Sequence, residues 1–294
     1  MKENTIDDLT RKLEEGVQQV FTSENYRNYL KVMSKFTTYS WSNSLLIVLQ
    51  CPQASLVAGY KKWQEFHRHV KPGEKGIRIF APCVSKKKVT VSKIDGSVID
   101  ENDPSNTDVE TKTVKKVYFK AISVFDVSQT DGEPLPSLGV ENLSGSVEEY
   151  QQFFDAIVGI SDVPVRFDTI LGEAKGYYSN TEKQIVLQSG MSELQTFKTA
   201  VHELAHSKLH DKDMLDELGI KKDRETKEVE AESVAYIVCQ HFGLDTSEYS
   251  FSYIAGWSSG REAAELKNSL KLISNTAHTF IDQINAFRER KMIA

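Results

Sequence analysis

Two histidines and a glutamate near the middle of the chain have the spacing of a metal-hydrolase motif. The stretch VHELAHSKLHD, residues 201–211, places His202 and His206 four residues apart, with Glu203 directly after the first. Because residues four apart share one face of an α-helix, the two imidazoles can ligate one ion. Glu203 stands where a HExxH motif carries the general base for metal-assisted hydrolysis. The stretch predicts a Zn²⁺ site, with another divalent ion such as Mn²⁺ as an alternative.

A third histidine follows at the same interval. His210 lies eight residues from His202, about 12 Å away along a straight helix, so the two cannot bind one ion. A glycine after the second histidine could turn the chain, but Ser207, Lys208 and Leu209 contain none. We expect His210 to pack against, or to support, a ligand rather than to bind the metal.

The third ligand is expected from a second, acidic helix. A catalytic zinc usually takes three protein ligands and leaves one position open. Within ETKEVEAESVAY, Glu228 and Glu232 are four apart on one face, whereas Glu230 is expected to point elsewhere. We assign Glu228 as the ligand and Glu232 as the acceptor of a hydrogen bond from a ligand histidine. The spacing also allows the reverse assignment, and either glutamate could belong to a solvated acidic face.

This donor set predicts peptide hydrolysis. A bound ion would lower the pKa of a water molecule and polarise a scissile carbonyl. Glu203 is expected to take the proton and to deliver it to the leaving amine. An oxyanion would need one more donor, and the sequence does not separate Tyr177, Tyr236 and Tyr253 as candidates.

Charge is distributed unevenly along the chain. Residues 1–126 carry 20 Lys and Arg against 15 Asp and Glu, whereas residues 127–294 carry 16 against 27. Residues 60–93 alone hold ten basic side chains and two acidic ones. This stripe indicates either a polyanion partner for the N-terminal half or a solvated basic face.

Bulk features argue against a membrane or secreted protein. No apolar run approaches the roughly 18 residues that span a bilayer. The polar start MKENTIDDLTRKLEE does not resemble a secretory signal. Cys51, Cys83 and Cys239 are too far apart for a CxxC pair or a disulfide framework. We expect a cytoplasmic protein without a membrane partner.

Periodicity predicts an α+β chain of two domains. Helices are expected over residues 5–21, 25–36, 41–51 and 60–69, and strands at IRIFAP, VTVSKI and KVYFKAISVFDV. Residues 94–112 read as a hairpin insertion or mobile loop, and residues 128–146 as a linker. The predicted domains are therefore 1–127, mixed helix and antiparallel sheet, and 147–294.

The second domain is expected to alternate helices and short strands. A helix at VEEYQQFFDAIVGI precedes the strands PVRFD, GYYS and KQIVLQ, the last two joined by SNTEK. Ser192 and Gln195 fit a capping box at the start of the histidine helix. The acidic helix is expected over about residues 225–242, and a long helix over about 261–289. In zincins the strand before the histidine helix forms the substrate-side edge, which would be KQIVLQ.

These segments together resemble the ArdC-type antirestriction proteins of conjugative plasmids and related mobile elements. HELAHSKLH followed by EVEAESVAYIVCQHFG is similar to their zincin-like, gluzincin-type metallopeptidase domain. TTYSWSNSLLIVLQCPQASLVAGYKKWQEFHRHVKPGEKGIRIFAP is similar to their single-stranded DNA-binding domain, and VFDVSQTDGEPLP to the segment that closes it. The resemblance implies protection of incoming single-stranded DNA during conjugation. It leaves open whether hydrolysis is the biological activity.

The N-terminal half has the composition that single-strand binding needs. Such sites combine a basic groove with aromatic side chains on which bases stack. Aromatic and basic residues interleave here, and Asn43 could bond a base or cap a helix, although the tryptophans could instead be core. The candidate contacts are Tyr39, Trp41, Asn43, Lys61, Lys62, Trp63, Lys71, Lys75 and Arg78.

Two competing interpretations remain. The protein could protect DNA by binding alone, with a structural or inactive metal site. It could also be an ImmA-like regulatory peptidase that cleaves a repressor, with the basic domain docking on a protein–DNA complex. The protein or peptide substrate is not identified by the sequence.

Overall fold

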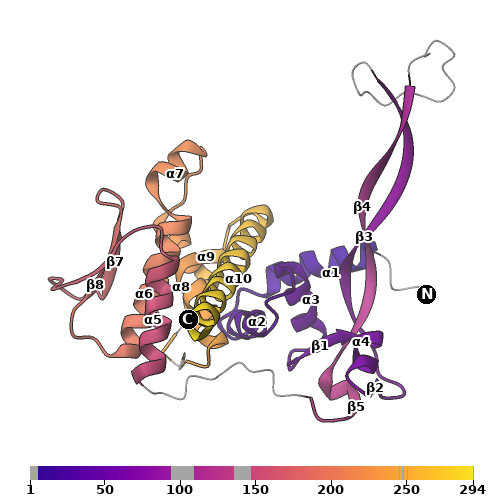
Figure 1. Ribbon diagram of the computed structural model, residues 1–294, viewed down its shortest axis with the longest axis horizontal. Helices are drawn as coiled ribbons and strands as arrows, with labels where there is room; N and C mark the ends of the chain where they lie inside the picture. Colours follow the sequence, from indigo (N-terminus) through magenta and orange to yellow (C-terminus); the bar gives the residue numbers. More distant parts are fainter. Residues whose placement is uncertain are drawn as a thin grey trace.

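The computed structural model describes residues 6–93, 109–135, 147–244, 246, 248–249 and 251–293, which form an α+β protein of two parts (Figure 1). The N-terminal part contains α1 (Ile6–Gln19), α2 (Ser23–Lys35), α3 (Trp41–Gln50), β1 (Val57–Gly59), α4 (Tyr60–Glu65), β2 (Arg68–Val70), β3 (Ile77–Ser92), β4 (Val109–Asp126), η1 (Val127–Gln129) and β5 (Thr130–Gly132). The C-terminal part contains α5 (Val147–Ile160), β6 (Val165–Asp168), β7 (Gly176–Ser179), β8 (Gln184–Gln188), α6 (Glu193–Leu209), α7 (Lys212–Glu217), α8 (Arg224–His241), α9 (Ile254–Ser258) and α10 (Ala263–Ile293). Each described helix is too short or too polar to cross a lipid bilayer.

Side-chain caps set the starts of the main helices. Ser40 accepts a hydrogen bond from the Asn43 backbone at α3, and Asp223 accepts one from the Thr226 backbone at α8. At α6, the Ser192 hydroxyl accepts from the Gln195 backbone, as predicted. The Gln195 side chain instead bonds Thr199 and Lys175, so only half of the expected capping box forms.

A long β-hairpin projects from the N-terminal part (Figure 1). IRIFAP and VTVSKI, expected as separate strands, belong to the single strand β3, which pairs with β4 from Ile77↔Val124 to Ser92↔Val109. Of the segment 94–112, residues 109–112 belong to β4, and residues 94–108 lie outside the described range. β1 pairs with the other edge of β4, which completes a sheet of order β1-β4-β3.

The predicted linker begins too early. Residues 127–129 form η1, in which Asp126 and Gln129 complete a capping box, and β5 pairs with β2 through Val70↔Thr130. Asp126 is buried and also accepts from the backbones of Ser55 and Leu56 at 2.7 and 3.1 Å. Residues 128–132 therefore belong to the N-terminal part, while 136–146 lie outside the described residues.

The C-terminal part packs helices on a small mixed sheet. The strand order is β6-β8-β7, with β8 parallel to β6 and antiparallel to β7. The expectation that KQIVLQ forms the edge is wrong, because this strand is β8 in the middle, and its side chains at 185–187 are buried. The edge strand near the histidine helix is β7.

The two parts share one hydrophobic core. Helix α2 packs on α8, and α10 runs back to contact α1 and α3. Phe21 and Tyr26 of the N-terminal part meet Trp257 and Phe251 of the C-terminal part, with ring centroids 5.5 and 5.3 Å apart. Tyr26 also shares a buried 2.8 Å hydrogen bond with Ser233. The boundary near residue 127 divides the sequence but not the core.

Candidate metal centre

Helix α6 presents His202 and His206 on one face. Their Nε2 atoms are 3.0 Å apart, and both rings are partly buried. The opposite side of the helix packs into the core through Val201, Leu204 and Ala205, all fully buried. The spacing of apolar and polar residues thus turns the two imidazoles toward α8.

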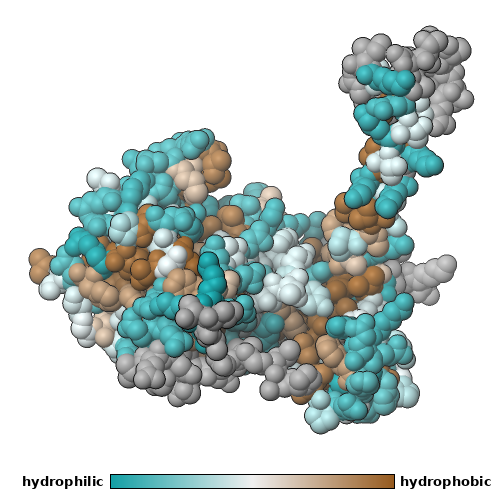
Figure 2. All heavy atoms as spheres, viewed as in Figure 1, coloured by the Kyte–Doolittle hydropathy of each residue, from teal (hydrophilic) through white to brown (hydrophobic). Residues whose placement is uncertain are grey.

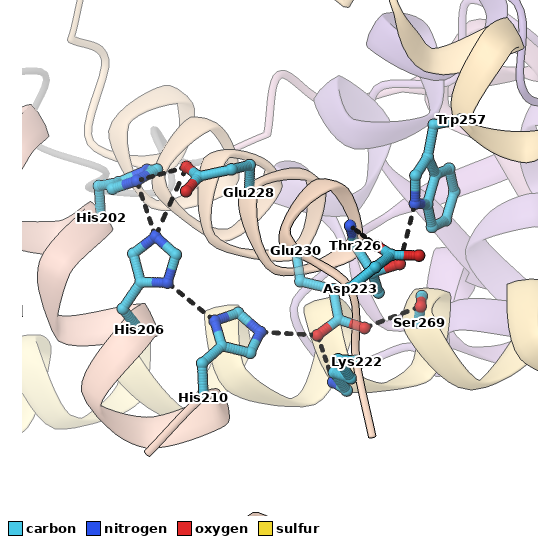
Figure 3. A network of polar contacts seen from close by, with 10 residues as sticks. All are labelled: His202, His206, His210, Lys222, Asp223, Thr226, Glu228, Glu230, Trp257 and Ser269. Atoms are coloured by element: carbon cyan, nitrogen blue, oxygen red, sulfur yellow. Dashed lines mark hydrogen bonds and ion pairs between the residues drawn. The ribbon is translucent and has the colours of Figure 1, made fainter. Parts of the chain in front are cut away.

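Helix α8 supplies Glu228 at the same point. Its Oε2 lies 3.4 Å from Nε2 of His202 and 3.6 Å from Nε2 of His206 (Figure 3). A tetrahedral ion with bonds of about 2.1 Å separates its ligand atoms by about 3.4 Å, so the three atoms fit such an ion. The neighbouring imidazoles of His202 and His206 hold the pKa of Glu228 far below its usual range. The structure brings the three predicted ligands together, and their assignment as ligands remains a prediction.

Glu203 lies beside this triad and is 7% exposed. Burial raises the pKa of its carboxyl, and the two histidines offset this only in part. The backbone of Tyr178 in β7 bonds the carboxylate. β7 approaches closely because residue 176 is glycine: a Cβ there would lie 2.6 Å from Cγ2 of Thr199 and 3.3 Å from Cγ of Glu203. The carboxyl predicted to act as general base is thus held between α6 and the edge strand.

A buried row of polar groups continues behind His206 (Figure 3). His210 caps the end of α6, and its Nδ1 lies 2.9 Å from Nδ1 of His206. Its Nε2 lies 2.9 Å from Oε2 of Glu230, which has no exposed side-chain surface. Burial lowers the pKa of His210 to about 4, despite the carboxylate, so the ring is neutral near pH 7. His210 contacts a predicted ligand without reaching the metal position.

The predicted role of Glu232 needs correction, because it accepts a hydrogen bond from the hydroxyl of Tyr253 rather than from a ligand histidine. Glu230 points away from the ligand triad, as expected, and contacts His210. Glu230 and His210 meet because α6 ends at Leu209, and His210, as the C-cap, lies against the face of α8 that carries Glu230. The repeated four-residue spacing of the histidines was the available signal for this contact.

The structure also distinguishes between the three tyrosines considered as donors to an oxyanion. Tyr236 is 2% exposed and packs against Tyr249 and Phe251, so its hydroxyl is unavailable. Tyr177 of β7 is 42% exposed and lines a 530 Å³ pocket over the triad. The hydroxyl of Tyr253 already donates a hydrogen bond to Glu232. Tyr177 is therefore the candidate that faces the pocket.

The residues predicted to contact DNA do not form one exposed surface in the structure. Trp63 is fully buried and donates to the carbonyl of Phe125, and the Asn43 amide is paired on both sides with the Phe80 backbone at 2.9 Å. The prediction for Trp63 is wrong, because its ring belongs to the core. Asn43 is only partly buried, but its amide is already paired with the backbone. Lys61 and Lys75 are exposed. Trp41 is partly buried, and the Tyr29 hydroxyl bonds its backbone carbonyl rather than its indole. The side chains of the others have protein partners: Tyr39 with Val57, Lys62 with Glu65, Lys71 with Ser128 and Asp131, and Arg78 with Ser123 and Ala121.

Comparison with known proteins matches both halves. Residues 1–125 match the N-terminal domain of anti-restriction factor ArdC, and residues 159–255 match the IrrE N-terminal-like domain of the M78 peptidases. The chain thus joins a domain similar to the ArdC N-terminal domain to one similar to an M78 peptidase domain. His202, Glu203, His206 and Glu228 all fall inside the peptidase-like match.

Individual known proteins are similar to this chain. An uncharacterised protein of Bacillus anthracis (pXO2-81) is 28% identical over 310 residues, covering 97% of this chain and 52% of the relative. The chain thus spans about half the length of this curated relative. The metal-free crystal structure of antirestriction ArdC from plasmid R388 is 22% identical, with a TM-score of 0.50 over 86% of each chain. Its Mn(II)-bound structure is 20% identical, with a TM-score of 0.48 over 85% of each chain.

Proposed function

We propose that the C-terminal part is a metal-dependent peptidase, with His202, His206 and Glu228 as ligands and Glu203 as general base. The observation that carries this proposal is the ligand triangle of 3.0, 3.4 and 3.6 Å, which fits one tetrahedral ion. Two imidazoles and one carboxylate form a donor set typical of catalytic Zn²⁺, and another divalent ion such as Mn²⁺ remains an alternative. When bound, the ion would lower the pKa of a water molecule and polarise a carbonyl.

The chain's own residues suit an extended peptide. β7 is the edge strand beside the triad, and an extended peptide can add to such an edge by backbone hydrogen bonds. Glu203 lies within the same pocket, where its buried carboxyl can accept a proton and pass it to a leaving amine. Tyr177 lines this pocket, which supports it as the donor to a developing oxyanion.

The test uses the full chain and two site variants. Glu203→Gln should keep stoichiometric metal and lose hydrolysis of a labelled unfolded protein such as casein, whereas His202→Ala should lose the metal. Glu217→Gln, an exposed glutamate on α7, is the matched control and should behave as wild type. Protein purified without chelators that carries no divalent metal would refute the site. If Glu203→Gln protects DNA from restriction as well as wild type, binding alone performs that protection.

We further propose that the N-terminal part binds single-stranded DNA along the β3–β4 hairpin. The described strands carry eight Lys and Arg against two acids, and exposed apolar side chains accompany them. Phe119 is 57% exposed, and Tyr118, Val117 and Ile122 are also exposed. Figure 2 shows hydrophobic surface at the base of the hairpin and hydrophilic surface further out. This pairing of open aromatic rings and lysines is what base stacking and phosphate contact require.

The hairpin base also forms a groove. A pocket of 860 Å³ lies between α1, α3 and the two strands, lined by Tyr39, Phe80, Phe119 and Ile122 among others. Tyr39 keeps a place in the proposed surface through this groove. Asn43 also lines the groove, with its amide paired to the Phe80 backbone, whereas the buried Trp63 does not line it.

Binding by the full chain should be measured on an oligonucleotide and on its duplex at several salt concentrations. Lys116→Glu should weaken single-strand binding and flatten its salt dependence by about 0.7 in log–log slope, while Lys271→Glu on α10 makes the same charge change elsewhere. Phe119→Ala should weaken binding without changing the slope, and Phe167→Ala on exposed β6 should not weaken it. Equal affinity for the duplex would contradict the proposal.

A further inference from the structure

Behind the metal centre, polar groups from three helices and one loop converge in the core. Glu230 comes from α8, Ser269 from α10, Lys222 from the segment before α8, and His210 from the end of α6. His210 and Glu230 have side chains that are 2% and 0% exposed, and Lys222 is 8% exposed. Figure 3 shows this row leading from Glu230 through His210 to His206. The proposed peptidase mechanism assigns no direct role to Glu230, Ser269, Lys222 or His210.

The partners of Glu230 determine the direction of its hydrogen bonds. Oε1 accepts from the Ser269 hydroxyl at 2.8 Å, and Oε2 accepts from the Lys222 ammonium as well as facing Nε2 of His210 at 2.9 Å. An ionised carboxylate has no proton to donate. Nε2 of His210 must therefore carry the hydrogen of this contact.

The hydrogen on Nε2 of His210 also determines which nitrogen of His206 is protonated. A neutral imidazole donates from one nitrogen and accepts at the other, so Nδ1 of His210 is an acceptor. It lies 2.9 Å from Nδ1 of His206, which must then donate. Nε2 of His206 is left with its lone pair, and this is the atom that faces His202 and Glu228 at 3.0 and 3.6 Å.

We propose that Glu230 and His210 are positioning residues, which hold His206 in the tautomer that can ligate a metal through Nε2. The inference rests on the proposed metal site. Metal-ligating histidines commonly donate their second ring N–H to a carboxylate, which sets tautomer and orientation. In this chain a second histidine stands between the carboxylate and the ligand.

Stability alone does not account for the arrangement. Replacing a buried ion pair by apolar residues of similar volume is often neutral or stabilising, so a buried carboxylate with three donors needs another reason. The end of α6 supplies the geometry. His210 is the C-cap, one turn beyond His206, and its ring reaches both His206 and Glu230.

The first test reads the tautomer directly in the metal-free full chain. Long-range ¹H–¹⁵N correlation should show His206 protonated on Nδ1 and unprotonated on Nε2. A wild-type spectrum with the proton on Nε2 overturns the proposal, and this measurement requires no variant to fold.

The second test compares two replacements of similar size. His210→Gln keeps one donor for Glu230 and one acceptor for His206, whereas His210→Leu keeps neither. Zn²⁺ affinity by chelator competition should fall about 10- to 100-fold in His210→Leu, with most of it restored in His210→Gln. Tyr26→Phe loses a buried hydrogen bond to α8 outside this row and should bind Zn²⁺ as wild type does. Equal Zn²⁺ affinity of the Leu and Gln variants would refute the positioning role.

The outcomes separate this proposal from the peptidase assignment. Wild-type protein that binds Zn²⁺, shows the expected tautomer and hydrolyses nothing would refute the peptidase and retain the positioning role. A hydrolytic wild type with the other tautomer would do the reverse.

Discussion

Removing one ring from the shared core should destabilise both halves of the chain together. Phe21 is 3% exposed and contacts Tyr26 and Trp257, each with ring centroids 5.5 Å away. Truncating a buried Phe to Ala costs about 3–5 kcal/mol, through lost burial and the cavity that remains. For a chain longer than 250 residues this corresponds to a fall of about 6–10 °C in Tm. We expect Phe21→Ala to cause this loss.

Native-state hydrogen exchange can locate the effect. At about 1.4 kcal/mol for each tenfold change, the slowest amides of both α3 and α8 should lose about 100- to 5000-fold in protection. Phe119→Ala, which removes an exposed ring, should stay within about 0.5 kcal/mol of wild type. If protection falls in α3 and is unchanged in α8, the halves unfold separately and the reasoning from a shared core fails.

Three further predictions concern single side chains. His210 has a folded pKa of about 4, below the unfolded value of about 6.5, so the unfolded chain takes up a proton first as pH falls. The free energy of unfolding should therefore fall by roughly 3 kcal/mol between pH 6.5 and pH 4. Urea titrations should show that this pH-dependent component is missing in His210→Leu. Gly176→Ala should reduce peptide hydrolysis while far-UV circular dichroism is unchanged, because its Cβ meets Thr199 and Glu203; undiminished hydrolysis would contradict that contact. Asp126→Ala should lower stability by about 3 kcal/mol or more in thermal melts, since three backbone amides lose their acceptor, and a loss under 1 kcal/mol would refute it.

Local patterns in the sequence predicted the elements and the ligand triangle. Spacing of four residues is a property of any α-helix, so His202 and His206 had to share a face, and only the meeting of two helices was left to infer. Ser192 marked the start of α6 because its side chain bonds the backbone amide of Gln195, three residues on. Such short-range physics is present in the sequence itself.

Contacts between distant segments were not readable in the same way. A tryptophan such as Trp63 could stack on bases at the surface or pack in the core, and its sequence neighbours do not distinguish the two. Its burial depends on a distant contact, the hydrogen bond from its indole to the carbonyl of Phe125. Glu230 was set aside because its neighbours on α8 formed the expected pair, whereas its partners come from positions 210, 222 and 269. The shared core was missed because helical periodicity shows that a face is apolar but not what covers it.

The return of α10 to the N-terminal helices has a consequence for biosynthesis. Ile281 and Ile284 of α10 belong to the same buried core as Leu45 and Leu46 of α3, and α10 contacts α3 directly. At translation rates of about 5–20 residues per second, roughly 10–50 s separate the synthesis of these segments. During that interval the apolar face of α1–α3 lacks its cover. The nascent chain should therefore need chaperone occupancy until α10 has left the ribosome.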